Sequence, residues 1–147
     1  MTSRLLPRIE QPLAKGWSHM FRIPKNVNHT IVFEVSPGDV EDFLSEYGID
    51  VLSTARLLHY MAVAARELLK RYIPQDHTSV GYYFEIYHVK PTTIGERAQV
   101  TAKLLNVDGY KAEFKIEVKV KDEVVAKARH KRRIISVQKM IRRVYGV

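Results

Sequence analysis

The sequence predicts an α+β domain in which an antiparallel sheet packs against one long helix. Between residues 53 and 73, apolar side chains recur at spacings of three and four, which is typical of an amphipathic helix. From Thr78 onward they alternate with polar side chains, which is typical of half-buried strands. One strand, one helix and then four strands is an order that favours a sheet covered by the helix on its apolar face. With 147 residues, the chain can bury such a core within one domain.

The chain before the helix is predicted to contain an arm, a strand and a loop. Residues 1–26 form the arm, because four residues interrupt any helical period: Pro7, Pro12, Gly16 and Pro24. Residues 27–35, VNHTIVFEV, are rich in β-branched residues and precede a Ser-Pro-Gly turn, so we expect a strand there. Residues 39–50 are expected to form a loop with a short helical turn.

The long helix is predicted to begin at Ser53 and to end before Pro74. The Ser53 hydroxyl can accept a hydrogen bond from a first-turn amide that has no partner within the helix. Pro74 cannot continue the helix, which leaves about five turns. One side of these turns is apolar and comprises Leu57, Leu58, Met61, Ala65, Leu68, Leu69 and Tyr72.

Four strands are predicted to follow, in residues 78–90, 97–107, 110–121 and 123–136. Asp108-Gly109 is a strong two-residue hairpin signal, and residues 121–123 provide the next reversal. In residues 110–121, apolar and charged side chains alternate without exception, so one face of the sheet is apolar and the other is charged. After the domain of residues 27–136, residues 137–147 return to helical spacing and are expected to form a short basic amphipathic tail.

The net charge of +8 is concentrated at the end of the chain. Residues 127–147 contain eight basic residues and no acidic one, whereas the remaining 126 residues contain sixteen of each sign. Such a segment attracts polyanions, whether nucleic acid, an anionic membrane or a phosphorylated ligand. The alternative is a solvated edge that keeps the protein soluble.

The composition excludes several classes of site. Without cysteine, the chain can form no disulfide, thiolate nucleophile or thiolate metal site. The first residues lack the apolar run of a signal peptide, and no run of eighteen apolar residues occurs. We therefore expect a cytoplasmic protein with no transmembrane segment, and we predict neither a metal site nor a cofactor.

Two junctions carry a resemblance to a known family. The segment VLST, ending at Thr54, resembles the start of the central helix in the fluoroacetyl-CoA thioesterase-like branch of the hot-dog fold superfamily. The segment TSVGYYFEIYHVKPTTIG resembles the strand and turn that carry that branch's catalytic histidine, here His88. It also places Gly81 on the substrate-side glycine, and Thr92 and Gly95 on the following turn. Further on, VDGYKAEFKIEV and ARHKRRII resemble the hairpin and the final strand, so the similarity covers residues 27–136.

The resemblance implies a hot-dog fold, with an antiparallel sheet wrapped around the central helix. It also implies a homodimer or higher homo-oligomer that binds an acyl-CoA thioester between subunits and hydrolyses it. Thr54 and His88 are the implied catalytic residues. Four residues are predicted to contact the substrate: Gly81, Arg129, His130 and Arg132. The family's catalytic glutamate lies eight residues after the threonine, and here that position is Ala62.

Thioester hydrolysis explains why these residue types would be placed together. A neutral histidine can accept and return a proton, and a hydroxyl at a helix start lies near free amides that favour developing negative charge. Alanine can neither orient the histidine nor act as a base. Asp50, Asp76 and His59 are the remaining candidates for a partner.

His130 and Arg132 continue the covered face of the last strand, which is unexpected for a core. Either a β-bulge shifts the register, or both residues emerge at a subunit boundary or pocket mouth that holds an anion. In the second case they would join Arg129, Lys131 and Arg133 in binding the phosphates of coenzyme A.

Two other functions compete with hydrolysis. The same fold can serve as a non-catalytic acyl-CoA sensor or carrier, which the alanine at position 62 favours. A nucleic-acid or partner-binding module would instead use the basic tail. We rank this reading last, because Tyr145 is the tail's only aromatic residue and offers little base stacking.

Overall fold

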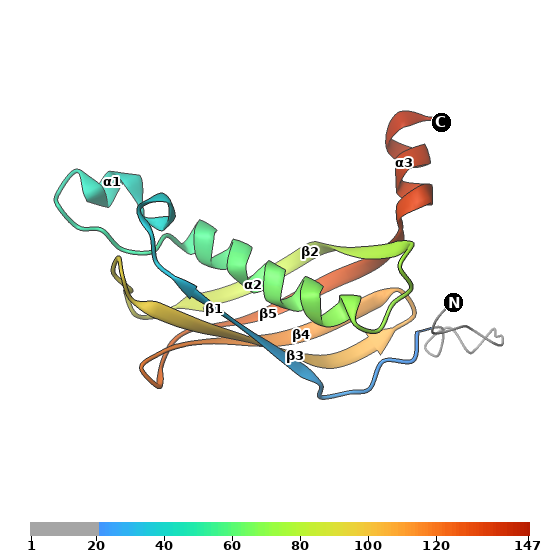
Figure 1. Ribbon diagram of the computed structural model, residues 1–147, viewed down its shortest axis with the longest axis horizontal. Helices are drawn as coiled ribbons and strands as arrows, with labels where there is room; N and C mark the ends of the chain where they lie inside the picture. The colour runs from blue at the N-terminus through green and yellow to red at the C-terminus, as the bar shows by residue number, and fades with distance from the viewer. Residues whose placement is uncertain (1–20) are drawn as a thin grey trace.

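The computed structural model describes residues 21–147, and within them five antiparallel strands form one sheet. Helix α2 (Thr54–Lys70) lies lengthwise against one face of this sheet (Figure 1). The strand order is β1-β3-β4-β5-β2, so β1 and β2 are the edges. This confirms the predicted α+β architecture. The strands are β1 (Asn28–Glu34), β2 (His77–His88), β3 (Arg97–Asp108), β4 (Lys111–Val120) and β5 (Glu123–Ser136).

Helix α2 begins and ends as the sequence predicts. The Ser53 hydroxyl accepts a hydrogen bond from the Arg56 amide at 3.0 Å, which caps the first turn. Two of the buried α2 residues are alanines, and their small side chains let the helix approach the sheet closely. The side of α2 that packs on the sheet comprises Leu57, Met61, Ala64, Ala65, Leu68 and Leu69.

The sheet reverses direction where turn signals were identified. Gly109 has a φ of 62° in the β3–β4 turn, and Lys121 and Asp122 have φ of 51° and 63° in the β4–β5 turn. The alternation in β4 is also confirmed, because every second residue from Ala112 to Val120 is buried. These buried side chains face the helix and form one continuous core with it.

The segments before and after β1 were predicted to be an arm and a loop with a short helical turn. The loop of residues 39–50 does carry a short helical turn, α1 (Asp42–Ser45), which follows the 3₁₀ turn η2 (Pro37–Asp39). Residues 1–20 of the predicted arm lie outside the described residues. Phe21, at the end of that arm, is buried and packs edge-on against Tyr110 at 5.6 Å between ring centroids.

The β2–β5 ladder contains a bulge between Gly81 and Tyr83, beside a buried polar network. The Arg132 guanidinium donates to the Ser79 hydroxyl at 2.8 Å, to the Ser79 carbonyl at 2.7 Å and to His130 Nε2 at 3.1 Å. His130 Nδ1 in turn donates to the Tyr83 carbonyl at 2.9 Å. A buried cation is therefore tolerated because neutral acceptors satisfy it.

The network explains why residue 81 is a glycine. A Cβ atom added to Gly81 would lie 2.8 Å from His130 Cε1 and 3.3 Å from Arg132 Nη1. The His130 ring cannot move aside easily, because it is stacked on Phe84 with 3.7 Å between ring centroids.

The last helix, α3 (Val137–Tyr145), projects from the end of β5 beside the β2 edge (Figure 1). Within residues 21–147, no helix is both long and apolar enough to cross a bilayer.

We predict that Gly81→Ala lowers the free energy of unfolding by about 1–3 kcal/mol, because the new methyl group overpacks the His130–Arg132 network. Chemical denaturation measures this change. Gly38→Ala is the matched control, since a Cβ there meets no atom within 4 Å. Equal stabilities of the two variants would contradict this account of the network.

Candidate functional site

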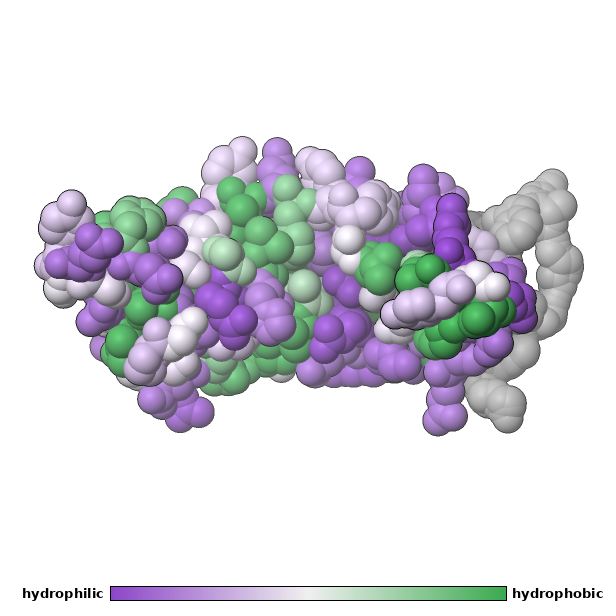
Figure 2. Space-filling view, turned by 90° about the horizontal axis from the view of Figure 1, so that it is seen from above, coloured by the Kyte–Doolittle hydropathy of each residue, from purple (hydrophilic) through white to green (hydrophobic). Residues whose placement is uncertain are grey.

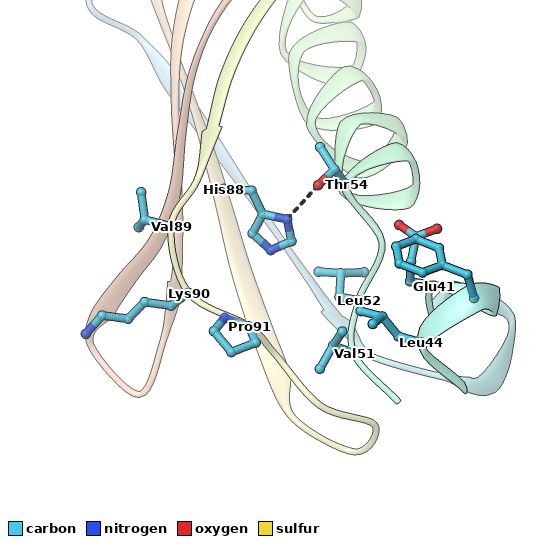
Figure 3. A pocket seen from close by; sticks show the side chains of 10 residues that line it. Glu41, Leu44, Val51, Leu52, Thr54, His88, Val89, Lys90 and Pro91 are labelled. Atoms are coloured by element: carbon cyan, nitrogen blue, oxygen red, sulfur yellow. Dashed lines mark hydrogen bonds between the residues drawn. The ribbon is translucent and has the colours of Figure 1, made fainter. Parts of the chain in front are cut away.

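Thr54 and His88 come from different elements and meet at one end of the molecule. Thr54 is the first residue of α2, and His88 is the last residue of β2. The Thr54 Oγ1 and His88 Nδ1 atoms are 2.9 Å apart and share a hydrogen bond (Figure 3). The structure thus brings together the two residues that the sequence identified as catalytic candidates.

Main-chain hydrogen bonds fix the segment that leads into α2. The Leu52 amide donates to the Thr92 carbonyl at 2.8 Å, which ties this segment to the loop after β2. An isolated β-bridge between Val51 and Thr93 continues the contact. On the other side, the Ser53 amide donates to the Asp39 carbonyl at 2.8 Å. The Thr54–His88 distance is therefore set by backbone pairing and not by the two side chains alone.

The Asp39 carboxylate reinforces this arrangement from beneath the helix. It is only 2 % exposed and accepts hydrogen bonds from the Ser36 amide, Arg56 Nε and the Tyr60 hydroxyl, each within 3.1 Å. Burial alone would raise the pKa of Asp39, but the bonds from Ser36, Arg56 and Tyr60 together hold that pKa below its ordinary value. Asp39 is thus an ionised anchor for the first two turns of α2.

A pocket of about 250 Å³ opens beside the Thr54–His88 pair (Figure 3). Three segments line it: the α1 region, the lead-in to α2 and the end of β2 with its following loop. Six of its ten lining residues are apolar, and their side chains offer a surface for a short acyl chain. The lining residues are Glu41, Phe43, Leu44, Val51, Leu52, Thr54, His88, Val89, Lys90 and Pro91.

His88 has the protonation behaviour of a base. Burial lowers the pKa of its imidazole below the ordinary value of 6.5, so the ring is neutral at neutral pH. Its Nε2 atom is shielded from solvent and has no hydrogen-bond partner among the described residues. The Thr92 hydroxyl, four residues further along, is also buried without a partner among them.

The first turn of α2 offers donors close to Thr54. The Arg56 amide is occupied by the Ser53 hydroxyl, and the Leu57 amide donates to the Ser53 carbonyl at 3.0 Å. The amides of Thr54 and Ala55 have no acceptor among residues 21–147. Such free amides favour an oxygen that gains negative charge.

The three residues that the sequence offered as partners of the catalytic pair lie elsewhere. Asp50 accepts a hydrogen bond from Ser45, Asp76 pairs with His77, and His59 is exposed on α2. None of them lines the pocket. Ala62 lies eight residues beyond Thr54, roughly 12 Å along the helix axis. A side chain at position 62 therefore does not reach the Thr54–His88 pair of its own subunit.

Sequence reasoning missed two acids that the structure places at or near the pair. Glu41 lines the pocket from the residue before α1, and Asp39 anchors the helix. The Ser36-x-x-Asp39 pattern is a capping-box signal that could have identified Asp39. Glu41 belongs to an irregular segment without periodicity, so no comparable signal marks it.

The predicted substrate contacts do not gather at the pocket within one chain. His130 and Arg132 are in the buried network next to Gly81, where burial lowers the pKa of His130 to about 4 and that of Arg132 to about 10. Arg129 lies on the opposite, charged face of the sheet and pairs with Glu113 at 3.4 Å. Their role in substrate binding stays a prediction.

The arrangement is equipped for proton transfer at a carbonyl group. A hydroxyl and a neutral imidazole share a hydrogen bond at the pocket wall, and two free amides belong to the same first turn of α2, which are groups that acyl transfer uses. Within the described part of the chain, no cluster of three or more histidine, aspartate or glutamate side chains is arranged to hold a metal ion.

Comparisons with known proteins identify the family of this chain. The family model of FlK, the fluoroacetyl-CoA-specific thioesterase, matches residues 35–138. A search of curated proteins finds no significant match.

Solved structures show the same fold, which is the hot-dog fold. A hot-dog-like protein from Thermanaerovibrio acidaminovorans superposes with a TM-score of 0.77 and 24 % identity over 84 % of this chain and 91 % of that one. The fluoroacetyl-CoA thioesterase FlK gives 0.77 and 21 % over 84 % and 96 %. A variant of that enzyme, in complex with fluoroacetate and CoA, gives 0.73 and 21 % over 80 % and 99 %.

We predict that Asp39→Asn lowers the free energy of unfolding by about 1–3 kcal/mol at neutral pH, because charge-assisted hydrogen bonds to a buried acceptor are lost. The wild type should lose the same increment as the pH falls through the lowered pKa of Asp39, so the two stabilities should converge in acid. Denaturation curves across pH measure both effects. A constant gap between the two proteins at every pH would contradict the assignment of an ionised anchor.

Proposed function

Because this chain belongs to the fluoroacetyl-CoA-specific thioesterase family, we propose that it hydrolyses a small acyl-CoA thioester in the Thr54–His88 pocket. The observation that carries this proposal is the 2.9 Å hydrogen bond between Thr54 Oγ1 and His88 Nδ1 at the pocket wall. A hydroxyl bonded to a neutral imidazole is the arrangement of an activated nucleophile.

In the first half of the reaction, Thr54 Oγ1 attacks the thioester carbonyl carbon while His88 Nδ1 accepts the hydroxyl proton. The carbonyl oxygen becomes an anion, which the amides of Thr54 and Ala55 stabilise. The carbon–sulfur bond then breaks, and the leaving thiolate takes the proton back from His88. In the second half, a water molecule attacks the acyl carbon on Thr54 while His88 accepts one of its protons. The bond between that carbon and Thr54 Oγ1 then breaks, Oγ1 takes the proton back from His88, and the carboxylic acid leaves.

Because position 62 carries an alanine, no acid can reach the site from that position of a second subunit either, and water activation is left to His88 and to the one carboxylate in the pocket lining, Glu41. Glu41 enters from the α1 region on the opposite side of the pocket from β2 (Figure 3). We assign it the role of orienting the water of the second half-reaction. With this weaker arrangement, turnover is expected to be slow and to favour reactive thioesters.

The same proposal includes a homodimer built on the β2 edge. This strand is 12 residues long and has only one charged residue, Glu85, along its length. Four of its large apolar side chains are 41–62 % exposed: Val80, Tyr82, Tyr83 and Tyr87. Its outer edge pairs with no other strand of residues 21–147. A long apolar edge of this kind is a template for pairing, and antiparallel pairing with a second copy satisfies both edges.

A non-catalytic acyl-CoA binder is the second candidate, and the alanine at position 62 favours it. It would use the same pocket and the same donors, but thioester and protein would remain intact. Hydrolysis of a panel of acyl-CoA substrates, followed by thiol release, separates the two functions. Tight binding with no thiol release, unchanged by His88→Ala, would support the binder and contradict the enzyme.

We predict that His88→Ala lowers kcat/KM for acyl-CoA hydrolysis by about 10²–10⁴-fold, because the general base is lost. Thr54→Ala should cause a loss of similar size, and the double variant should lose little more, since the two residues act as a unit. His59→Ala, which removes an exposed histidine of the same helix, is the control. Additive losses in the double variant would contradict the shared role.

We also predict that kcat/KM falls in acid with an inflection below pH 6.5, because burial lowers the pKa of His88 and only its neutral form accepts a proton. The rate should be constant above that inflection until other groups titrate. Initial rates at constant ionic strength measure the profile. An inflection above 6.5 would show that His88 is not the titrating base.

A further inference from the structure

Helix α3 is amphipathic, and none of its residues is buried against residues 21–147. Ser136 caps its start by accepting from the Lys139 amide at 3.3 Å, and Gly146, with a φ of 73°, ends it. Its cations are Lys139, Arg142 and Arg143, and it has no acidic residue. Four apolar side chains are 39–74 % exposed: Val137, Ile141, Val144 and Tyr145. Figure 2 shows apolar and polar surface side by side at this end of the molecule.

The position of α3 relative to β2 is fixed by pairing. Ser136 pairs with His77, and the Val137 amide donates to the Asp76 carbonyl at 3.0 Å, so α3 starts beside the first residue of β2. The Thr54–His88 site lies at the other end of β2. A 12-residue strand spans roughly 35–40 Å, whereas the nine-residue α3 is only about 14 Å long. Helix α3 therefore cannot reach the site of its own subunit.

In a dimer, α3 of one subunit can lie close to the Thr54–His88 site of the other. When two β2 edges pair antiparallel about a two-fold axis, the start of each strand lies beside the end of the other. Helix α3 of one subunit then lies next to the Thr54–His88 site of the second. In Figure 1, α3 extends past the β2 edge, toward the side where that copy would pair.

The part of the pocket formed by residues 21–147 has no spare cation for a polyanionic ligand. Lys90 is the only basic residue among the described lining residues, and it forms an ion pair with Glu123. Glu41 adds a negative charge. Coenzyme A carries a pyrophosphate and a further phosphate on its nucleotide end, so a tightly bound CoA ester requires cations outside this lining.

We propose that α3 of one subunit binds the nucleotide phosphates of the CoA thioester held at the Thr54–His88 site of the other. Lys139, Arg142 and Arg143 supply the charge, and the apolar side of α3 rests on the second copy. The inference rests on the proposed function and adds its phosphate subsite. It also gives three of the eight basic residues in 127–147 a role in recognition.

The first experiment compares substrates with and without the nucleotide. In Arg142→Gln/Arg143→Gln, the KM for an acyl-CoA should rise about tenfold to a hundredfold with kcat unchanged, because two charge-assisted contacts are lost. The KM for the matching acyl-pantetheine should not change. Lys111→Gln/Lys127→Gln removes the same charge from exposed strand positions and should leave both KM values unchanged. Equal effects of the two double variants, or no effect of either, would overturn the proposal.

The second experiment tests whether α3 acts on the other subunit. Subunits carrying His88→Ala with an intact α3 are mixed with subunits carrying Arg142→Gln/Arg143→Gln with an intact His88. Each hybrid dimer then has one site with an intact His88 and an intact α3 from its partner, so low-KM turnover should return. If α3 served its own subunit, no hybrid site would be complete and the KM would stay high. A monomeric wild type would likewise overturn the proposal.

Calorimetry separates failure of this inference from failure of the proposed function. If the wild type hydrolyses no acyl-CoA, the enzymatic proposal fails, and the phosphate subsite is tested by the affinity for CoA and for pantetheine. Weaker CoA binding by Arg142→Gln/Arg143→Gln, with pantetheine binding unchanged, would support the subsite. Equal CoA affinity of the wild type and the variant would overturn it. The same conclusion would follow if the variant lost binding to phosphatidylserine vesicles while its CoA affinity stayed that of the wild type.

Discussion

Helix α2 packs lengthwise on the sheet, and the segment that leads into it is held against the loop after β2 by main-chain pairing. The Leu52 amide and the Thr92 carbonyl join the two segments at 2.8 Å. This contact places a helix start, with its free amides, beside the residue that ends an edge strand. Every functional feature follows from it, because Thr54, His88 and the apolar pocket converge only if this junction forms.

The two ends of β2 have different chemistry. At its end, a partly buried histidine with a lowered pKa shares its Nδ1 atom with the Thr54 hydroxyl, as a base acting on that hydroxyl requires. Near its start, a histidine and an arginine are fully paired in the interior, and a glycine leaves room for them. The second arrangement is rigid and fixes the course of the edge strand through its bulge. The same strand can thus present a reactive group at one end and a stable pairing surface along its length.

The sequence predicts most of the fold because its patterns are local and strong. Unbroken alternation in residues 110–121, the Asp108-Gly109 turn and the Ser53 cap each act within a few residues, and each is found in the structure. The Thr54–His88 pairing was predictable only through the family resemblance, since no local rule joins residues 34 positions apart. Glu41 and Asp39 were not predicted as functional, because their positions depend on how an irregular loop folds back on α2.

His130 and Arg132 show the limit of reading burial from residue type. Strict alternation places both on the covered face, and that is where they lie. The sequence could not show that Arg132 would bond to Ser79 and to His130, or that His130 would bond to the Tyr83 carbonyl. A bulge and a glycine on the neighbouring strand make this possible, and both depend on pairing between segments about 50 residues apart.

The most direct test of the central claim is a crystal structure with a non-hydrolysable analogue of a short acyl-CoA. The account predicts that the carbonyl carbon of the analogue lies about 3–3.5 Å from Thr54 Oγ1, with its oxygen toward the amides of Thr54 and Ala55. An analogue whose acyl group lies outside the pocket, away from both Thr54 and His88, would contradict it.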